Sequence, residues 1–281
     1  MKVNGETAVF GVIGNPISHT LSPQIHAMFA KICDVNMAYV PFHVNELSDA
    51  ICGAHALGIK GLNITVPYKK DVMPFLLSMD TMAQKVGAVN TLVWQPDGYV
   101  GYNTDYIGIS RTICAIGMDF LGKNVVILGA GGSAYAACIA AAEYGAKSIT
   151  IVNRTVENAK SLASHVKTYY DIPIEINKLN FDTYGFDIAI QTTTLGFGNN
   201  LNKSPVDDLK FFKGLQLTFD IIYTPKETMF LRQAKQAGVK TVNGFSMLIY
   251  QAAAAFSLWH KKDIPDEKLK SENFTMENLM L

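Results

Sequence analysis

The sequence predicts an α/β protein of two domains, the second of which contains a doubly wound parallel sheet. Its length of 281 residues suits one large domain or two smaller ones. Strand and helix patterns alternate along roughly the first hundred residues. A second alternating series follows. Its first strand is the continuous apolar run Val125–Leu128, which is typical of a parallel strand covered on both faces.

Short apolar runs bounded by turn residues mark the strands of the first domain. We expect strands at Val9–Ile13, Tyr39–His43 and Gly61–Pro67, and a hairpin made of Thr91–Trp94 and Gly98–Gly101. The dipeptide Ser22–Pro23 predicts the start of a helix, with Ser22 as the N-cap and Pro23 as the first helical residue.

The second domain opens with a helical pattern near Tyr106–Gly117. An Ala-rich helix that ends at Tyr144 follows the strand Val125–Leu128. Further strands are expected at Ser148–Val152, Ile174–Ile176, Ile188–Gln191, Leu217–Ile221 and Lys240–Val242. A helix is expected at Phe245–His260, and the charged last twenty or so residues predict a surface helix or a loose tail.

The composition excludes several classes of protein. Apolar residues make up 49% and charged residues 17%, which is a globular and not a disordered composition. Lys+Arg and Asp+Glu both number 24, so the basic excess of a nucleic-acid-binding protein is missing. The four cysteines and six histidines lack zinc-ligand spacing, and no apolar run reaches the roughly 20 residues of a membrane helix. We therefore expect a cytoplasmic protein with reduced cysteines and no metal, nucleic-acid or membrane partner.

A glycine motif, Gly129-x-Gly131-x-x-Ala134, lies between a predicted strand and a predicted helix. In such a loop the first glycine makes the tight turn, the second admits a pyrophosphate, and the small third residue lets helix and strand pack closely. The free N–H groups of the helix start face the anion. The motif predicts a Rossmann-type dinucleotide site whose contacts are Gly129, Ala130, Gly131, Gly132, Ser133 and Ala134.

The end of the next strand bears on the choice of dinucleotide. NAD-binding proteins usually carry an acidic residue there for the ribose 2′-hydroxyl, whereas this chain has Asn153-Arg154-Thr155. Arg154 can pair with a 2′-phosphate, and Asn153 and Thr155 can donate to the same group. The sequence therefore favours NADP, with NAD as the other possibility.

Polar side chains gather at the ends of several elements in the first domain. Thr20 and Ser22 place hydroxyls at a helix start, where the helix dipole favours a carboxylate. Asn63 and Thr65 share one face of the predicted strand. Lys69 follows the stop at Pro67 and gains chemical interest only beside a carboxylate.

Two further element ends contribute Asn90 and Asp105. Asp105 lies where the first domain gives way to the second, a place where ligands often bind. The alternative role for Asp105 is to cap the helix that begins at Tyr106.

Taken in order, these motifs resemble the shikimate dehydrogenase family from Gly14 to Trp259. The motifs are Gly14–Pro23, Asn63–Lys69, Gly87–Leu92, Asn103–Asp105, the glycine loop, Asn153–Thr155, Asp220–Pro225 and Gly244–Gln251. The resemblance implies NADPH-dependent reversible reduction of 3-dehydroshikimate to shikimate, in the synthesis of aromatic amino acids. The nicotinamide cofactor carries the hydride in such a reaction.

The resemblance also assigns residues and domains. Lys69 matches the catalytic lysine and Asp105 its partner. The implied substrate contacts are Thr20, Ser22, Asn63, Thr65, Asn90, Asp105, Tyr223 and Gln251. Thr192, Gly244 and Met247 are implied near the nicotinamide. Residues 1–105 with 245–281 are expected to bind substrate and residues 106–244 to bind NADP, with the helix Phe245–His260 returning to the first domain. A monomer or a homodimer is expected.

Three departures from the family pattern keep alternatives open. Thr20 stands where the family usually has Ser, Asn158 stands where many members carry a second basic residue, and Gln191–Gly196 differs in its first residues. The nearest alternative is a paralogue that oxidises quinate or shikimate with NAD. A metabolite sensor without activity and a dehydrogenase of folate-type substrates are more distant alternatives.

Overall fold

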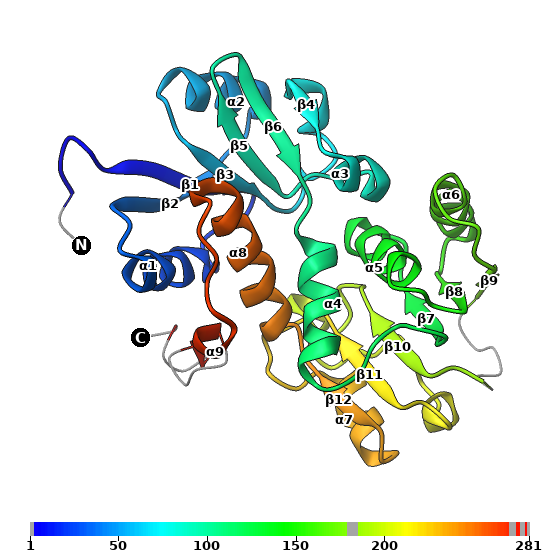
Figure 1. The fold of residues 1–281 in the computed structure, drawn as a ribbon. Helices are drawn as coiled ribbons and strands as arrows, with labels where there is room; N and C mark the ends of the chain where they lie inside the picture. Colours follow the sequence, from blue (N-terminus) through cyan, green and yellow to red (C-terminus); the bar gives the residue numbers. More distant parts are fainter. Residues whose placement is uncertain (1–2, 179–184, 270–273, 276–278, 280–281) are drawn as a thin grey trace. The chain divides into compact units, whose positions relative to one another are not determined.

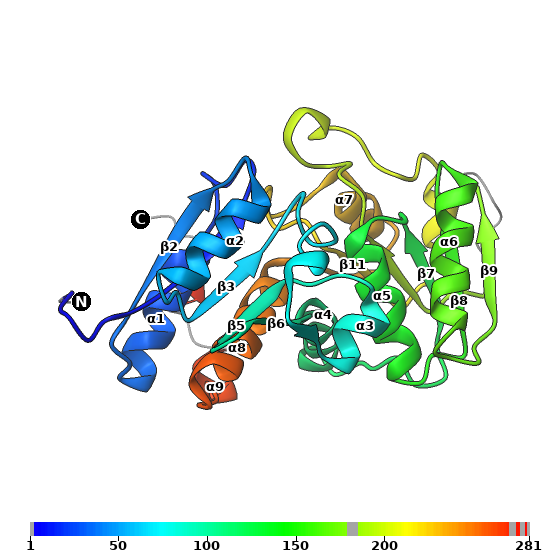
Figure 2. The same cartoon turned by 90° about the horizontal axis from the view of Figure 1, so that it is seen from above.

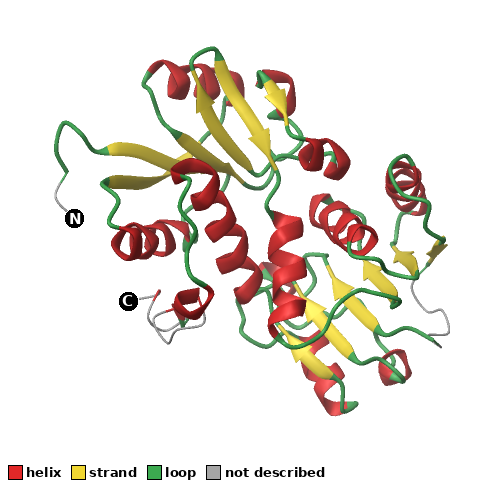
Figure 3. Cartoon of the chain, viewed as in Figure 1, coloured by secondary structure: helices red, strands yellow, loops and turns green. Residues whose placement is uncertain are grey.

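The chain forms two compact units in the computed structural model, which describes residues 3–178, 185–269, 274–275 and 279. The first unit comprises Met1–Gly108 and Ile249–Leu281, and the second comprises Ile109–Leu248. Figure 3 shows helices and strands alternating through both units. The α/β fold class expected from the sequence is confirmed.

The first unit is built on a six-stranded mixed sheet in the order β2-β1-β3-β5-β6-β4. Its strands are β1 (Ala8–Gly14), β2 (Met37–His43), β3 (Gly61–Ile64), β4 (Ser78–Met79), β5 (Thr91–Gln95) and β6 (Gly98–Tyr102). Strand β1 runs parallel to β2 and β3, whereas β5 pairs antiparallel with both β3 and β6. The expected hairpin is therefore confirmed as β5–β6.

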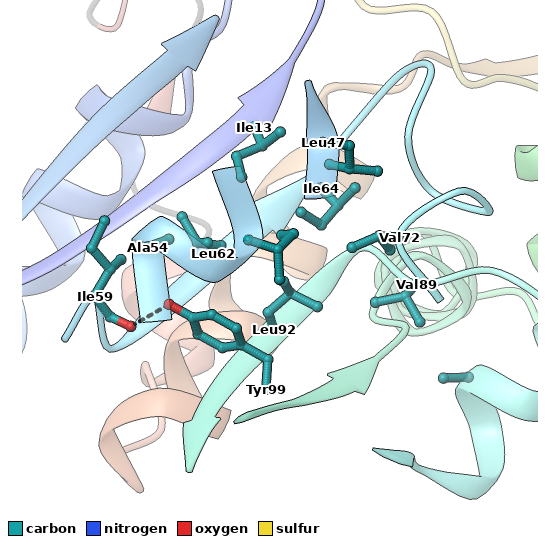
Figure 4. Close-up of a cluster of buried hydrophobic side chains, with 12 residues drawn as sticks. Ile13, Leu47, Ala54, Ile59, Leu62, Ile64, Val72, Val89, Leu92 and Tyr99 are labelled. Atoms are coloured by element: carbon teal, nitrogen blue, oxygen red, sulfur yellow. Dashed lines mark hydrogen bonds between the residues drawn. The ribbon is translucent and has the colours of Figure 1, made fainter. Parts of the chain in front are cut away.

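Helices cover both faces of this sheet. Against one face, α2 (Leu47–Ala56) packs through an apolar cluster that includes Leu47, Ile51, Leu62 and Leu92 (Figure 4). Tyr99 joins this cluster and donates a hydrogen bond from its hydroxyl to the Ile59 carbonyl, at 2.7 Å. Figure 1 shows α1 (Ser22–Cys33) and α8 (Phe245–His260) on the other face. The remaining short helices of this unit are η1 (Met73–Phe75), α3 (Thr81–Val86) and α9 (Asp266–Leu269).

The start of α1 differs from the expectation. Leu21, in the right-handed helical region, is the N-cap, and Ser22 is the first helical residue. Leu21 makes no side-chain capping bond; instead, the Thr20 hydroxyl accepts from the Ser22 backbone N–H and donates to the Ser22 hydroxyl. The prediction that Ser22 is the N-cap was therefore wrong, and its hydroxyl makes no capping hydrogen bond to the helix backbone.

The second unit is a parallel sheet in the order β12-β11-β10-β7-β8-β9. Its strands are β7 (Asn124–Leu128), β8 (Ser148–Val152), β9 (Ile174–Asn177), β10 (Ile188–Gln191), β11 (Leu217–Asp220) and β12 (Lys240–Val242). Its helices are α4 (Asp105–Ala115), α5 (Gly132–Glu143), α6 (Val156–Lys167), η2 (Gly198–Asn200), η3 (Leu209–Phe212) and α7 (Met229–Gln236), with α4 beginning in the first unit.

Helices α5 and α6 cover one face of this sheet and α7 covers the opposite face (Figures 1 and 2). The strand order reverses between β10 and β8 around the central β7. This is the doubly wound arrangement, in which ligands bind at the carboxyl ends of the strands beside the point of reversal.

Helix α8 begins in the second unit and carries the chain back into the first, as expected. Near its end, the Trp259 indole N–H donates to the Leu92 carbonyl at 2.9 Å. A Cβ on Gly61 would lie 2.2 Å from the Trp259 Nε1, so this approach of helix to sheet requires glycine.

The described part of the C-terminal segment differs from a loose tail. The side chains of Leu269, the last residue of α9, and of Phe274 and Leu279 are all buried. The Phe274 ring lies 5.4 Å from the ring of Phe29 in α1. This aromatic contact anchors the segment to the first unit, although its sequence is rich in charged residues.

Among the described residues, no helix has the length and apolar character needed to cross a membrane. Cys33, Cys52, Cys114 and Cys138 are free thiols, and burial raises the pKa of Cys138.

Candidate active site and cofactor site

A lysine–aspartate pair lies at the centre of the polar groups of the first unit. The Lys69 ammonium lies 2.6 Å from Asp105 Oδ2. The side chains of Lys69 and Asp105 are 20% and 7% exposed. Two opposite charges that are close and largely shielded from water interact more strongly than an exposed pair. Some of the ammonium surface stays accessible, so Lys69 can still reach a bound molecule.

Asn90 fixes the other oxygen of this carboxylate. Its side-chain amide donates to Asp105 Oδ1 at 2.8 Å and to Thr104 Oγ1 at 3.0 Å. Its amide oxygen accepts from the Thr104 backbone N–H and from the Thr91 hydroxyl. Asn90 is thus fully hydrogen-bonded while buried, and it orients Asp105 toward Lys69.

Asn103 completes the support of Asp105 at the start of α4. Its side-chain oxygen accepts from the Asp105 backbone N–H at 3.0 Å, and its amide donates to the Ala88 carbonyl at 2.9 Å. Asp105 is the first residue of α4. The carboxylate therefore lies at a helix N-terminus, where the helix dipole favours its charge.

A second group of polar side chains surrounds Asn63 on β3. Its amide oxygen accepts from the Tyr39 hydroxyl at 2.7 Å, and its amide donates to the Asn90 carbonyl and the Thr91 hydroxyl, both at 3.2 Å. Because these bonds use both the donor and the acceptor groups of Asn63, the structure ties Asn63 and Asn90 into one network. Thr65 lies beyond the end of β3, so the expectation that the strand extends to Pro67 was wrong.

Thr20 and Ser22 form a hydroxyl pair at the start of α1. The Thr20 hydroxyl donates to Ser22 Oγ at 3.1 Å and accepts from the Ser22 backbone N–H at 3.2 Å. Burial raises the pKa of the neighbouring Tyr39 phenol well above its usual value, and a hydrogen bond with Ser22 partly opposes this shift. Tyr39 therefore connects the hydroxyl pair to Asn63.

Gln251 joins the network from α8. Its side-chain oxygen accepts from the Thr104 hydroxyl at 3.5 Å, and Thr104 in turn contacts Asn90. Seven of the eight substrate contacts expected from the sequence lie in the first unit; Tyr223 lies in the second.

The glycine loop of the second unit has the backbone that a dinucleotide needs. Gly129 has φ +117°, and a Cβ there would lie 2.5 Å from Thr192 Oγ1. A Cβ on Gly131 or on Gly132 would meet nothing within 4 Å, so the space beside the loop is open. No side chain caps the N-terminus of α5, whose first N–H groups have no acceptor within the helix. These features fit a pyrophosphate bound at the start of α5.

The residues expected at the adenosine end follow β8. Arg154 and Thr155 are exposed, and the Asn153 side-chain amide donates to the Thr155 carbonyl at 2.8 Å. Within the described part of the chain, the Arg154 guanidinium makes no ion pair or hydrogen bond. It is therefore available to pair with a phosphate.

The residues expected near the nicotinamide follow β10 and β12. The Thr192 hydroxyl donates to the Leu128 carbonyl at 2.8 Å, so Thr192 packs against the glycine loop. Gly244 is buried, and a Cβ there would lie 1.8 Å from the Ile221 carbonyl oxygen. Met247 is buried in α8. Tyr223 follows β11, and burial raises the pKa of its phenol.

The structure adds residues that the sequence reasoning missed. Thr91 and Thr104 lie within the motifs Gly87–Leu92 and Asn103–Asp105. Their positions next to Asn90 and Asp105 in the sequence were therefore a usable signal that they belong to the site. Tyr39 carries no such signal, because it reaches Asn63 only when β2 and β3 both pair with β1.

Comparisons with known proteins agree with these features. Three family models match the chain: shikimate dehydrogenase substrate binding domain over residues 12–92, shikimate / quinate 5-dehydrogenase over 113–226, and shikimate 5′-dehydrogenase C-terminal domain over 244–270. The shikimate dehydrogenase (NADP(+)) of Caldanaerobacter subterraneus subsp. tengcongensis is 40% identical over 284 residues, covering 97% of this chain and 100% of that protein.

Solved structures are also similar. A crystal structure of a shikimate dehydrogenase in complex with NADP+ has a TM-score of 0.91 and 36% identity, covering 99% of this chain and 96% of that one. The enzyme of Listeria monocytogenes in complex with shikimate and NAD has a TM-score of 0.89 and 29% identity, covering 96% and 97% of the two chains.

Proposed function

The chain belongs to the shikimate dehydrogenase family, and on that premise we propose that it catalyses the NADPH-dependent, reversible reduction of 3-dehydroshikimate to shikimate. This oxidoreductase reaction belongs to the synthesis of aromatic amino acids. The observation that carries the proposal is the Lys69–Asp105 pair, held at 2.6 Å inside a buried network of amides and hydroxyls.

The first unit supplies the substrate groups in this proposal. The hydroxyls of Thr20 and Ser22, at an uncapped helix start, suit the substrate carboxylate. Asn90, Asp105 and Gln251 suit its ring hydroxyls, because all three belong to the hydrogen-bond network around the ion pair. Thr65, which lies just after β3, is proposed as a further contact to these hydroxyls. Asn63 positions these groups through its bonds to Asn90 and Thr91. Tyr223, in the second unit, is proposed as a further contact to the carboxylate.

The second unit supplies the cofactor groups. Gly129–Ala134 would hold the pyrophosphate, Asn153–Thr155 the 2′-phosphate, and Thr192, Gly244 and Met247 the nicotinamide end. When bound, NADPH provides a hydride for the ketone carbon.

Lys69 provides the proton that the reduction requires. Its ammonium donates this proton to the carbonyl oxygen as negative charge develops there, and it takes the proton back in the reverse direction. Asp105 holds the Lys69 amine in place by accepting its hydrogen bond, and Asn90 prevents the carboxylate from rotating away. Lys69 is therefore the general acid/base and Asp105 its orienting partner.

The test is to measure kcat/KM for shikimate and for quinate, each with NADP and with NAD. The proposal requires the highest value for shikimate with NADP. The NAD-preferring quinate/shikimate dehydrogenase remains the second candidate, because Asn158 places no charge near Arg154 and Thr20 adds a methyl group to the hydroxyl pair. Higher values for quinate or with NAD would favour that candidate.

A Lys69→Ala variant tests the catalytic assignment. We expect kcat to fall by about a hundredfold or more while KM for shikimate changes little, because general acid/base groups contribute about 10²–10⁴-fold. Lys70→Ala removes a neighbouring exposed lysine and is the matched control. An unchanged kcat with a raised KM would assign Lys69 to binding alone.

We also propose that the protein is cytoplasmic and acts as a monomer or a homodimer. Light scattering coupled to size-exclusion chromatography distinguishes the two oligomeric states.

A further inference from the structure

We propose that Gln191, Asp220 and Thr228 position the nicotinamide end of the cofactor by tying together the loops that follow β10 and β11. We call these three residues the strand-end clamp. The inference rests on the proposed function and adds positioning residues to it.

The clamp lies where two neighbouring strands end. Gln191 is the last residue of β10 and Asp220 the last of β11, and the two are paired in register. Gln191 and Asp220 are both 0% exposed and Thr228 is 1% exposed. Because the carboxyl ends of parallel strands form the ligand-binding edge of such a sheet, the clamp lies at the base of that edge.

Gln191 holds the loop that follows its own strand. Its side-chain oxygen accepts from the Thr193 backbone N–H. Its amide donates to the Leu195 carbonyl at 2.9 Å and to Asp220 Oδ1 at 3.4 Å. One side chain therefore fixes both the start and the end of residues 193–195 and links them to the next strand.

Asp220 holds the segment that follows β11. Its Oδ1 accepts from the Ile222 backbone N–H at 3.0 Å, and its Oδ2 accepts from the Thr228 hydroxyl at 2.7 Å. Tyr223 lies between these two attachment points. Thr228 also accepts from the Leu231 backbone N–H, so the far end of the segment is fixed to the start of α7.

The clamped loops connect to two further parts of the candidate cofactor site. Thr192 follows Gln191 directly and bonds to the Leu128 carbonyl before the glycine loop, through both its backbone and its hydroxyl. On the other side, the Gly244 backbone N–H donates to the Ile222 carbonyl at 3.0 Å. The Asn243 side chain donates to the Lys226 carbonyl at 2.9 Å.

The burial of Asp220 argues for a specific role. A buried carboxylate is costly, and within the described residues Asp220 has hydrogen bonds but no ion pair to offset that cost. Burial raises its pKa to about 6, while Thr228, Ile222 and Gln191 oppose the shift. A fully hydrogen-bonded polar group inside a core rigidifies its surroundings, which is what precise placement of the two loops requires.

The inference predicts a separation between binding and turnover. The proposed contacts to the pyrophosphate and the 2′-phosphate lie at residues 129–134 and 153–155, and the clamp contains none of them. Loosening the clamp should therefore leave most of the NADPH affinity intact while disordering the reacting ring. Misplacement of a reacting group by a small distance strongly reduces the rate.

The experiment uses Gln191→Ala and Thr228→Val in the full-length chain. Thr218→Val is the matched control, because Thr218 is a fully buried threonine on β11 whose hydroxyl has no partner among the described residues. NADPH is titrated into each protein without substrate, and its affinity and nicotinamide fluorescence anisotropy are recorded. The kcat for shikimate oxidation is measured separately. If Gln191→Ala fails to fold, Thr228→Val decides the test; it removes the hydroxyl that donates to Asp220 and accepts from the Leu231 backbone N–H.

For the clamp variants we expect kcat to fall about tenfold or more, with the NADPH Kd within about threefold of wild type and a lower nicotinamide anisotropy. Thr218→Val should match wild type in all three. A Kd that rises in parallel with the loss of kcat would overturn the proposal, because it indicates general damage to the second unit. Unchanged kcat and anisotropy would overturn it as well.

The same titration separates this inference from the proposed function. A wild-type protein that binds NADPH but oxidises neither shikimate nor quinate would refute the proposed reaction, and anisotropy alone would then decide whether the clamp orients the ring. A wild-type protein that does not bind NADPH would overturn both.

Discussion

Single residues define the chemistry proposed for the candidate site. Lys69 lies two residues after Pro67, in the turn that follows β3, and Asp105 stands at a helix start. Each has an ordinary surface or capping role when considered alone. Only their 2.6 Å separation makes them the pair that we propose to be catalytic, and that distance depends on how β3 and β6 lie in one sheet.

We attribute the preference for NADP to one exposed arginine. Arg154 is the only basic residue in the segment Asn153–Asn158 and is free to contact a phosphate. We expect Arg154→Ala to reduce the ratio of kcat/KM with NADP to that with NAD by about tenfold or more, which corresponds to about 1.4 kcal/mol. The measurement is the pair of kcat/KM values with shikimate held at saturation.

Arg232→Ala is the control for this prediction. Arg232 lies on α7 in the same unit, is also largely exposed, and interacts with Glu227 at 3.7 Å. Removing it changes the net charge equally but leaves the proposed phosphate contact in place. An NADP preference that survives in Arg154→Ala would exclude this arginine from recognition of the 2′-phosphate.

At the scale of elements, the sequence was a good guide to long, strongly patterned segments. The strands β8, β10 and β12 and the helix α8 have the bounds that the sequence predicts. Among the elements without predicted bounds, β4 has two residues and α3 has six, whereas α2 has ten. β4 depends on pairing with β6, and α3 begins at an Asp80 cap and ends at Gly87 in the left-handed region. Such elements follow from tertiary pairing and local capping more than from periodicity.

The junction between β12 and α8 depends on a glycine. A Cβ on Gly244 would lie 1.8 Å from the Ile221 carbonyl oxygen and 2.4 Å from its carbon, both of which are backbone atoms. Backbone cannot rotate away as a side chain can, so Gly244→Ala must move one segment. We expect this variant to lower the free energy of unfolding by about 2–4 kcal/mol, measured by urea denaturation.

Gly53→Ala is the control, because we expect it to raise the free energy of unfolding and not to lower it. Gly53 is an exposed position inside α2, and a Cβ there would meet nothing within 4 Å. Replacing a helical glycine with alanine should raise the free energy of unfolding by about 0.5–1 kcal/mol. A Gly244→Ala variant as stable as wild type would show that the two segments can separate without cost.

At the scale of the whole molecule, the sequence predicted both sheets but not the contacts that cross elements. The glycine loop and the continuous apolar strands predict the parallel sheet, because each pattern lies within one short stretch of sequence. The aromatic cluster on the first unit gives no local signal: His26 on α1 stacks on Tyr39 of β2 at 4.3 Å and lies 5.2 Å from Trp259 of α8. It forms only when three segments distant in sequence meet.

This cluster also makes the stability of the protein depend on pH. Burial, together with the nearby His260, lowers the pKa of His26 to about 3, and Asn63 opposes this shift. Burial and Lys262 lower the pKa of His260 to about 4. In the folded state these two histidines bind protons less well than in the unfolded state. Their contribution to stability is therefore complete above pH 6.5 and is lost as the pH falls toward 3.

The contribution of Asp220 to stability changes with pH in the opposite direction. Its folded pKa of about 6 exceeds the unfolded value of 3.8, so the folded state takes up its proton first. Its contribution to stability is therefore lost as the pH rises from about 4 to 6. The change in the free energy of unfolding with pH combines the effects of the histidines and of Asp220. The difference between a histidine variant and wild type therefore gives the contribution of that histidine.

His26→Phe tests the histidine contribution directly. Phenylalanine keeps an aromatic ring against Tyr39 and removes two buried ring nitrogens that make no geometrically acceptable hydrogen bond among the described residues. We expect the variant to lose less stability than wild type between pH 6 and pH 4, by about 2–3 kcal/mol in urea denaturation, because one buried histidine contributes about 1.4 kcal/mol per pH unit there. His43→Phe alters an exposed histidine at the end of β2 and should keep the wild-type slope. Equal slopes for His26→Phe and wild type would mean that the first unit opens enough to hydrate His26 before it unfolds.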